Sequence, residues 1–396
     1  MKAYNEQWIY NRQILELAER WYQKRLLSNQ QIAAIRQAYP VLFRQTNGFI
    51  EIGLFLFTTV AILACYLLPA SVFSALFESQ TTYGLFNVGF GIGVGVVGQL
   101  LINRRLLYRN GVDNAFVATL TGFLAFGLNQ FLPNGLSVAT HCFITLPLLL
   151  LVLWYYGDTL IAFFTLATFY VFVFDSLLNV SWGKDALPFV MIAVSILIYL
   201  GVKQIIRQTP KQVYYTDPLN LAQWISLLVL VASGNYFVVR ELNGLLLKPS
   251  LIASRASIAP EISLSWLFWL MTFVIPTIYL WQGLAKRNRM LIILGVLGWI
   301  GAVITVHEYA ALVPLNVALT IGGLVMIGLA VAGIQYLRQS KLGFTDMADD
   351  DSPNELLSNM GTLASIQATT NAQHESRNDV RFGGGNFGGA GSEGNY

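Results

Sequence analysis

Long apolar segments dominate the chain from residue 48 onwards, and short polar stretches separate them. Each segment approaches the ~20 residues that an α-helix needs to cross ~30 Å of hydrocarbon. Helices are expected because backbone groups that face lipid must be paired within their own segment. The pattern therefore predicts an all-α fold, a polytopic transmembrane bundle over residues 47–337. It has about ten spans, near residues 48–69, 82–102, 112–132, 135–156, 158–178, 186–206, 220–239, 262–282, 290–306 and 311–336.

The first 46 residues have a different, amphipathic pattern. Apolar residues such as Trp8 and Ile14 recur at three- and four-residue spacing, with charged residues between them, as on a surface helix. Ser28 followed by Gln31 has the form of a capping box that opens a second helix. We expect residues 1–46 to form a cytosolic helical hairpin, which either pads the membrane entry or docks a partner.

Residues 338–396 change character again. An acidic run is followed by a glycine-rich end, FGGGNFGGAGSEGNY, which cannot bury a hydrophobic core. We expect a flexible cytosolic tail. It is either a plain appendage or a partner-binding or sorting tag built on Phe382, Phe387 and Tyr396.

Composition agrees with a membrane location. Of the 396 residues, 55% are hydrophobic and 11% are charged, whereas a soluble protein carries about 25% charged residues. The net charge of +3 is too weak and too dispersed for nucleic-acid binding. Cys65 and Cys142 both lie inside apolar segments, which excludes a disulfide framework and a zinc site. The expected partners are the lipid bilayer and other proteins, with no cofactor and no resident metal ion.

Basic residues set an orientation through the positive-inside rule. If the hairpin is cytoplasmic, the cytoplasmic connections contain Arg104, Arg105, Arg109, Lys203, Arg207, Lys211, Lys286, Arg287 and Arg289. The external connections then contain fewer, namely Lys184, Arg240, Lys248 and Arg255. An even number of spans returns the C-terminal tail to the cytoplasm. Both termini are therefore predicted to be cytoplasmic.

The second apolar segment is rich in glycine. Gly93, Gly95 and Gly98 match the spacing of a dinucleotide-binding fingerprint, but that fingerprint needs a strand that hands over to a helix. We therefore interpret Gly91, Gly95 and Gly98 as a face for close helix packing. The alternatives are a hinge and an ion path with exposed backbone carbonyls.

Ionisable residues inside apolar segments are the candidates for chemistry. On the external side, His141, Asp175, His307 and Glu308 would form a protonatable or cation-binding cluster if their helix ends converge. On the cytoplasmic side, Glu51, Asp113 and Asp158 lie near arginine-bearing connections, and ordinary interfacial ion pairing is the interpretation. Polar residues within the spans either line a path or form interhelical hydrogen bonds: Asn87, Gln99, Asn129, Asn235 and Asn316.

The stretch Trp21–Ile32 contains a Leu-Leu-Ser-x-x-Gln pattern and leads through Tyr39 into the first apolar segment. It resembles the start of a bacterial family of predicted multi-pass membrane proteins of unknown function, which have a cytosolic helical hairpin ahead of many spans. The likeness covers about the first 70 residues. It implies a bacterial inner membrane and carries no activity with it.

Two functions remain open. The first is a non-enzymatic component of a membrane complex, a scaffold or sensor whose hairpin and tail hold partners. The second is a permease or channel for a small solute or ion, which the spans, the glycine-rich segment and the in-span prolines favour. Those prolines, which could break helices, are Pro147, Pro188, Pro276 and Pro314. No catalytic motif is present, and we expect no enzyme.

Overall fold

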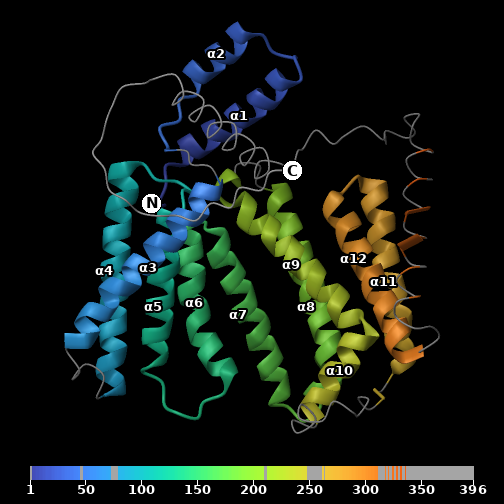
Figure 1. The fold of residues 1–396 in the computed structure, drawn as a ribbon. Helices are drawn as coiled ribbons and strands as arrows, with labels where there is room; N and C mark the ends of the chain where they lie inside the picture. Colours follow the sequence, from blue (N-terminus) through green and yellow to red (C-terminus); the bar gives the residue numbers. More distant parts are fainter. Residues whose placement is uncertain are drawn as a thin grey trace, which may run out of the picture.

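The computed structural model describes residues 2–44, 48–72, 79–208, 212–247, 261–262 and 264–310, together with single positions between 317 and 335. Regular structure in this part of the chain is helical, and an isolated β-bridge joins Arg44 to Leu107 (Figure 1). Seven helices are long and apolar enough to cross a membrane, or eight if one bent pair counts as a single span. The all-α prediction is therefore confirmed for this part of the chain, which has several helices that could span a membrane. The count of about ten spans and the cytoplasmic position of both termini stay predictions. The predicted tail at 338–396 and most of the segment at 311–336 lie outside the described residues.

The elements follow the apolar pattern closely. They are α1 (Glu6–Gln23), α2 (Asn29–Ala38), α3 (Gly48–Val72), α4 (Gln80–Arg105), α5 (Val112–Asn129), α6 (Val138–Tyr156), α7 (Thr159–Leu178), α8 (Gly183–Gln208), the 3₁₀ turn η2 (Gln212–Tyr215), α9 (Thr216–Gly234), α10 (Tyr236–Leu247), α11 (Ser265–Lys286) and α12 (Arg289–Ala310). The candidate spans are α3, α4, α6, α7, α8, α11 and α12, and the bent pair is α9 with α10.

The hairpin α1–α2 forms for local reasons. The Asn5 side chain accepts the backbone N–H groups at the start of α1. At the start of α2, Ser28 and Gln31 form the predicted capping box, with the two hydrogen bonds at 3.3 and 2.8 Å. An ion pair between Arg36 and Glu19 at 3.1 Å links the two helices.

The longer helices pack as antiparallel hairpins in two halves. The first half consists of α3–α7 and the second of α8–α12, and α7 contacts α8 and α9 where the halves meet (Figure 1). Because the chain reverses between consecutive long helices, with α9 and α10 forming one bent pair, the ends of the helices fall on two opposite sides. We call the side that carries α1 and α2 the α1 end. The described basic residues at that end include Arg104, Arg105, Arg109, Lys203, Arg207, Lys286, Arg287 and Arg289.

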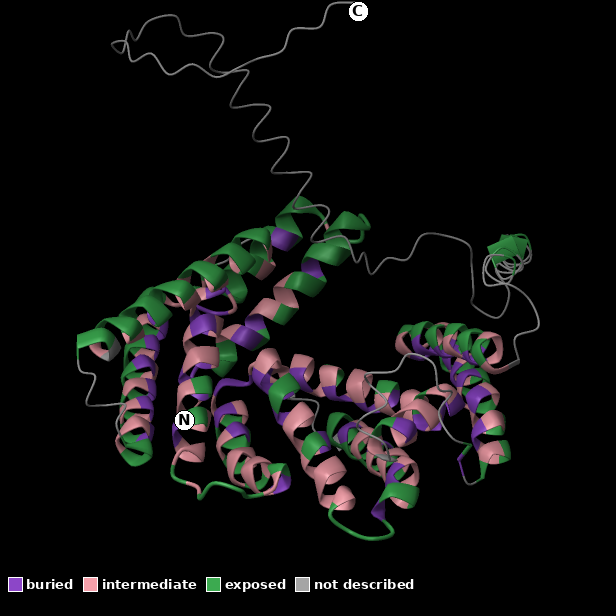
Figure 2. Cartoon of the chain, turned by 60° about the horizontal axis from the view of Figure 1, so that its bottom comes forward, coloured by how far each residue is buried: buried purple, intermediate pink, exposed green. Residues whose placement is uncertain are grey.

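Glycines set how closely α4 and α5 approach. A Cβ atom added at Gly98 would lie 2.8 Å from Phe116, one at Gly95 would lie 3.0 Å from Leu120, and one at Gly91 would lie 3.2 Å from Leu124. A larger side chain at these positions would push the two helices apart. By contrast, α3 packs loosely, since 6% of its most apolar stretch is buried, against 28% for α4. Figure 2 shows exposed residues along the outer faces of the helices and buried ones at their contacts.

The helix break lies at a position that the sequence did not indicate. The helices α6, α8 and α11 run through Pro147, Pro188 and Pro276, so these three prolines, which could have broken helices, do not end them, and Pro314 lies outside the described residues. The predicted span at 220–239 instead bends by 76° between α9 and α10, at Asn235. Its side-chain oxygen accepts the N–H of Val238 at 3.2 Å and so begins α10 as a cap.

Candidate functional site

The segment Lys2–Tyr4, just ahead of α1, is inserted into the α1 end of the first half. The N–H of Ala3 donates to the carbonyl of Tyr155 at 3.1 Å. The carbonyl of Ala3 accepts a hydrogen bond from Gln99 Nε2 at 3.4 Å. Ala3 and Tyr4 are both buried. The hairpin is therefore attached to α4 and α6 by the backbone that precedes it.

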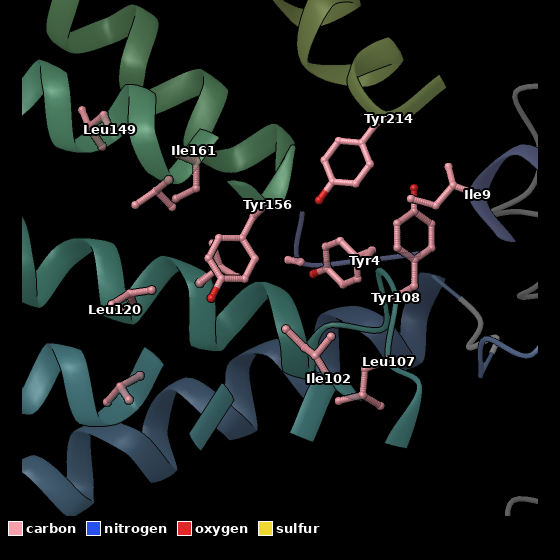
Figure 3. Packing of buried hydrophobic residues seen from close by; sticks show 14 of the residues in the cluster. Tyr4, Ile9, Ile102, Leu107, Tyr108, Leu120, Leu149, Tyr156, Ile161 and Tyr214 are labelled. Carbon is pink, nitrogen blue, oxygen red and sulfur yellow. The ribbon is translucent and has the colours of Figure 1, made fainter. Parts of the chain in front are cut away.

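The ring of Tyr4 lies among three other tyrosines. Its centroid is 5.1 Å from that of Tyr108 and 6.4 Å from those of Tyr156 and Tyr214 (Figure 3). The rings of Tyr108 and Tyr156 meet it edge to face, the arrangement that aromatic quadrupoles favour. We call these four residues the tyrosine cluster. It joins the segment before α1 to the α4–α5 loop, the end of α6 and η2.

The hydroxyl group of Tyr4 donates to Asp113 Oδ2 at 3.0 Å. Asp113 is 0% exposed and accepts two further hydrogen bonds, from the N–H of Arg109 at 2.7 Å and of Asn110 at 3.0 Å. Three hydrogen-bond donors thus replace the water molecules that the buried carboxylate can no longer bind. The loop can wrap around it because Gly111 has φ +88°, and an added Cβ there would clash with the carbonyl of Glu51.

Cationic groups surround the tyrosine cluster on its outer side. The Arg109 side chain pairs with Asp217 at the start of α9, and its guanidinium lies 5.3 Å from the ring of Tyr108. Lys2 Nζ lies 4.5 Å from the centre of the Tyr214 ring. Such cation–π contacts stabilise the packing of the α4–α5 loop, η2 and the segment Lys2–Tyr4 against one another.

Burial raises the pKa of two titratable groups at the site. Burial, together with the charge of Asp113, raises the pKa of Tyr4 well above its ordinary value. Burial also raises the pKa of Asp158, although hydrogen bonds from backbone N–H groups oppose this shift. A cavity of about 10 Å³, room for about one water molecule, lies between Tyr4 and Asp158. Tyr4 therefore acts as a neutral donor at physiological pH, and its hydrogen bond to Asp113 holds the segment before α1 in place.

The carboxylates at the α1 end are not paired in the way the sequence indicated. Asp113 binds Tyr4 and backbone N–H groups, while the nearby arginine binds a different residue, Asp217. Glu51 Oε1 accepts from Asn114 Nδ2 at 3.2 Å. Asp158 caps α7 by accepting the N–H of Ile161 at 3.0 Å. The prediction of interfacial arginine pairing was wrong for Asp113, because loop N–H groups lie closer to it than any guanidinium.

The four residues of the predicted external cluster all lie at the end opposite the α1 end. Asp175 accepts the N–H of Ala139 at 2.7 Å and so caps α6, and His141 Nδ1 lies 2.7 Å from Asn129 Oδ1. His307 and Glu308 lie near the end of α12 in the second half. Within the described residues no group of three or more possible ligands is arranged to hold a metal ion. Convergence of the two pairs stays a prediction.

Three of the predicted in-span polar residues make hydrogen bonds between helices, whereas Gln99 donates to the carbonyl of Ala3 and to Asn103 of its own helix. Asn87 accepts from Tyr66 at 3.3 Å, Asn129 donates to Thr145 at 2.9 Å, and Asn235 accepts from Thr305 at 3.1 Å. Asn316 lies outside the described residues. For these three asparagines the structure shows the interhelical bonds that were one of the two interpretations.

Sequence reasoning missed the tyrosine cluster. The signal available to it was the recurrence of tyrosine at the ends of segments on one side, in Tyr108, Tyr155-Tyr156 and Tyr214-Tyr215. No protein-family model, no curated protein and no solved structure matches the chain. The geometry of the site therefore carries the functional argument.

Proposed function

We propose that the protein is a non-enzymatic component of a membrane complex, a scaffold or sensor whose hairpin α1–α2 binds a partner. The observation that carries this proposal is the insertion of Tyr4, which fixes the hairpin to the bundle through Asp113. A hairpin that merely padded the membrane entry would need no buried anchor. Because Tyr4 anchors the hairpin, a displacement of α1 would be transmitted directly to α4, α5 and α6.

The outer face of α1 supplies a surface for the partner. Tyr10, Leu17 and Trp21 are between 41% and 52% exposed. Their seven- and four-residue spacing places them on one stripe of the helix, whereas Ile9 and Ala18, which lie on other sides of α1, are buried. An apolar stripe of this kind fits an amphipathic helix of a partner protein.

The orientation in this proposal follows from charge. The α1 end carries most of the described basic residues and is assigned to the cytoplasm by the positive-inside rule. About ten spans then place both termini in the cytoplasm, and the glycine-rich tail becomes a second binding segment beside the hairpin. The resemblance of residues 21–32 to a bacterial family supports an inner-membrane location.

Cross-linking of the full-length protein in native membranes, followed by mass spectrometry, tests the proposal. Leu17→Asp with Trp21→Asp should remove the cross-linked partner, because two charges interrupt the stripe. Leu26→Asp is the matched control, since Leu26 is exposed but follows α1. Recovery of the same cross-linked partners with the wild type, the double variant and Leu26→Asp would contradict the proposal.

A permease or channel is the second candidate, and the bend at Asn235 favours it. Discontinuous helices with buried polar residues form the transport sites of many carriers. Here Asn235, Thr272 and Thr305 are buried around the bend. Reconstitution into liposomes with dyes for protons, Na⁺ and K⁺ tests this function. Flux that Asn235→Val abolishes would support it, and the absence of flux would count against ion transport.

A further inference from the structure

A large cavity lies within the membrane-spanning part of the first half. Its volume is about 630 Å³, and residues of α3, α4, α5, α6 and α7 line it. This volume is within the range of sites that hold organic ligands. The cavity arises because α3 packs mainly on α5 and leaves space towards α6 and α7.

Four of the five threonine hydroxyl groups in the wall of the cavity are already engaged. Thr59 donates to the carbonyl of Phe55, and Thr119, Thr121 and Thr145 likewise each donate to the carbonyl four residues earlier, at 2.6–2.8 Å. Their protons are therefore turned towards their own helices. The remaining wall is mostly aliphatic and aromatic, which suits a hydrocarbon and not an ion or a chain of water molecules.

The shape and the opening of the cavity suit a chain. Along α3 the lining runs from Phe55 to Tyr66, eleven residues or about 16 Å at 1.5 Å per residue. Leu63, Phe126 and Phe164 also line it and are 44–46% exposed. These partly exposed side chains come from α3, α5 and α7. The cavity thus opens sideways, towards the region that lipid occupies.

One end of the cavity is polar. Tyr66 donates to Asn87 Oδ1 at 3.3 Å, and its hydroxyl lies 3.5 Å from that of Tyr83. Tyr83 is three residues into α4, on the side opposite the α1 end. Tyrosines at this depth sit where hydrocarbon meets the head groups of a bilayer. The oxygen-bearing end of a lipid would therefore lie near Tyr66 and Tyr83.

We propose that this cavity binds one hydrocarbon chain of a membrane lipid from the leaflet opposite the α1 end. The chain runs along α3 from Tyr66 towards Phe55. This inference stands on the cavity alone and is independent of the proposed function. Failure of partner binding at α1 would leave it intact.

Gly122 provides a direct test. It lines the cavity, is exposed, and a Cβ added there meets nothing within 4 Å. Gly122→Phe should therefore fill the space without a clash, and replacing glycine raises helix propensity. The matched control is Gly93→Phe on α4, where an added Cβ also meets nothing within 4 Å but the position does not line the cavity.

The experiment uses the full chain in nanodiscs that contain a phosphatidylcholine with a diazirine at the end of one acyl chain. After illumination, mass spectrometry locates the modified peptides. The wild type should be labelled in the Phe55–Leu63 part of α3 and around Gly122. Labelling there should be largely lost in Gly122→Phe, because the phenyl ring occupies the space that the acyl chain would fill, and should be unchanged in Gly93→Phe.

Two outcomes would overturn the proposal. One is equal labelling of the cavity residues in the wild type and in Gly122→Phe. The other is a wild type in which the Phe55–Leu63 part of α3 and the region around Gly122 stay unlabelled. Mass spectrometry of lipids extracted from the purified protein identifies which kind of hydrocarbon chain is bound, since acyl and isoprenoid lipids differ in mass. Melting temperatures of both variants near that of the wild type confirm that they fold.

Discussion

Two buried polar centres, one in each half, obtain their hydrogen-bond donors in different ways. In the first half Asp113 accepts hydrogen bonds from the Tyr4 hydroxyl and from two loop N–H groups. In the second half Asn235 accepts from Thr305 and from the N–H of Val238. The first centre holds a carboxylate and the second a neutral amide. We call them the Asp113 centre and the Asn235 bend.

The difference shows what a charge demands inside a packed bundle. A buried carboxylate needs more donors than an amide does, and the α4–α5 loop supplies two of the three. The third comes from Tyr4, outside the bundle, so satisfying the charge also fastens the hairpin. The amide finds its partners within the second half, where it shapes a span without recruiting a distant segment.

The largest expected effect comes from removing the charge. Asp113→Ala leaves the Tyr4 hydroxyl and two N–H groups without their acceptor, and should lower the free energy of unfolding by about 3 kcal/mol. Thermal unfolding in mild detergent measures it. Asp113→Asn, which keeps one carbonyl oxygen, should retain more of the stability. An unchanged melting temperature in the alanine variant would show that the carboxylate is not needed.

The next effect tests whether the Asn235 bend is self-contained. Asn235→Val removes the acceptor for Thr305 and for the N–H of Val238, and should cost about 2 kcal/mol. Limited trypsin digestion of the hairpin should be unaffected, because its anchor lies in the other half. Faster cleavage within α1–α2 in this variant would mean that the two centres are coupled.

A smaller effect isolates the anchor. Tyr4→Phe keeps the ring in the tyrosine cluster but removes a hydrogen bond to a charged group, which is worth about 1.5 kcal/mol. Tryptic cleavage at Arg25, in the turn between α1 and α2, should accelerate by about tenfold. Tyr215→Phe on the neighbouring exposed rim is the comparison, and equal acceleration in both would refute a specific role for the Tyr4 hydroxyl.

The smallest effect concerns pH. Because burial raises the pKa of Asp158, the folded protein holds this proton at a higher pH than the unfolded chain does. The stabilisation is complete below the unfolded pKa and is lost as pH rises through the folded pKa. Asp158→Asn keeps a cap for α7 but carries no charge. The Asp158→Asn variant should be more stable than the wild type at about pH 7, and this difference should shrink as the pH falls to about 4. A difference in melting temperature that stays constant with pH would contradict this.

The parts of the fold that depend on neighbouring residues could be predicted from sequence. The capping box of Ser28 and Gln31 and the helices over the apolar segments are local, so pattern was enough. The pairing of Tyr4 with Asp113 joins residues 109 positions apart, and nothing near either residue indicates it. The bend at Asn235 depends on Thr305, from another helix. Pro276 could have broken a helix, yet α11 continues through it.

The tyrosine cluster also sets an order of events during synthesis. Tyr4 leaves the ribosome early, but its site is incomplete until Tyr214 in η2 has been made. At the usual 5–20 residues per second, this interval lasts roughly 10–40 s. During this interval the hairpin has been made, but the site that binds Tyr4 is still incomplete. Docking of Tyr4 thus comes late in assembly and marks a first half that has been completed by the start of the second.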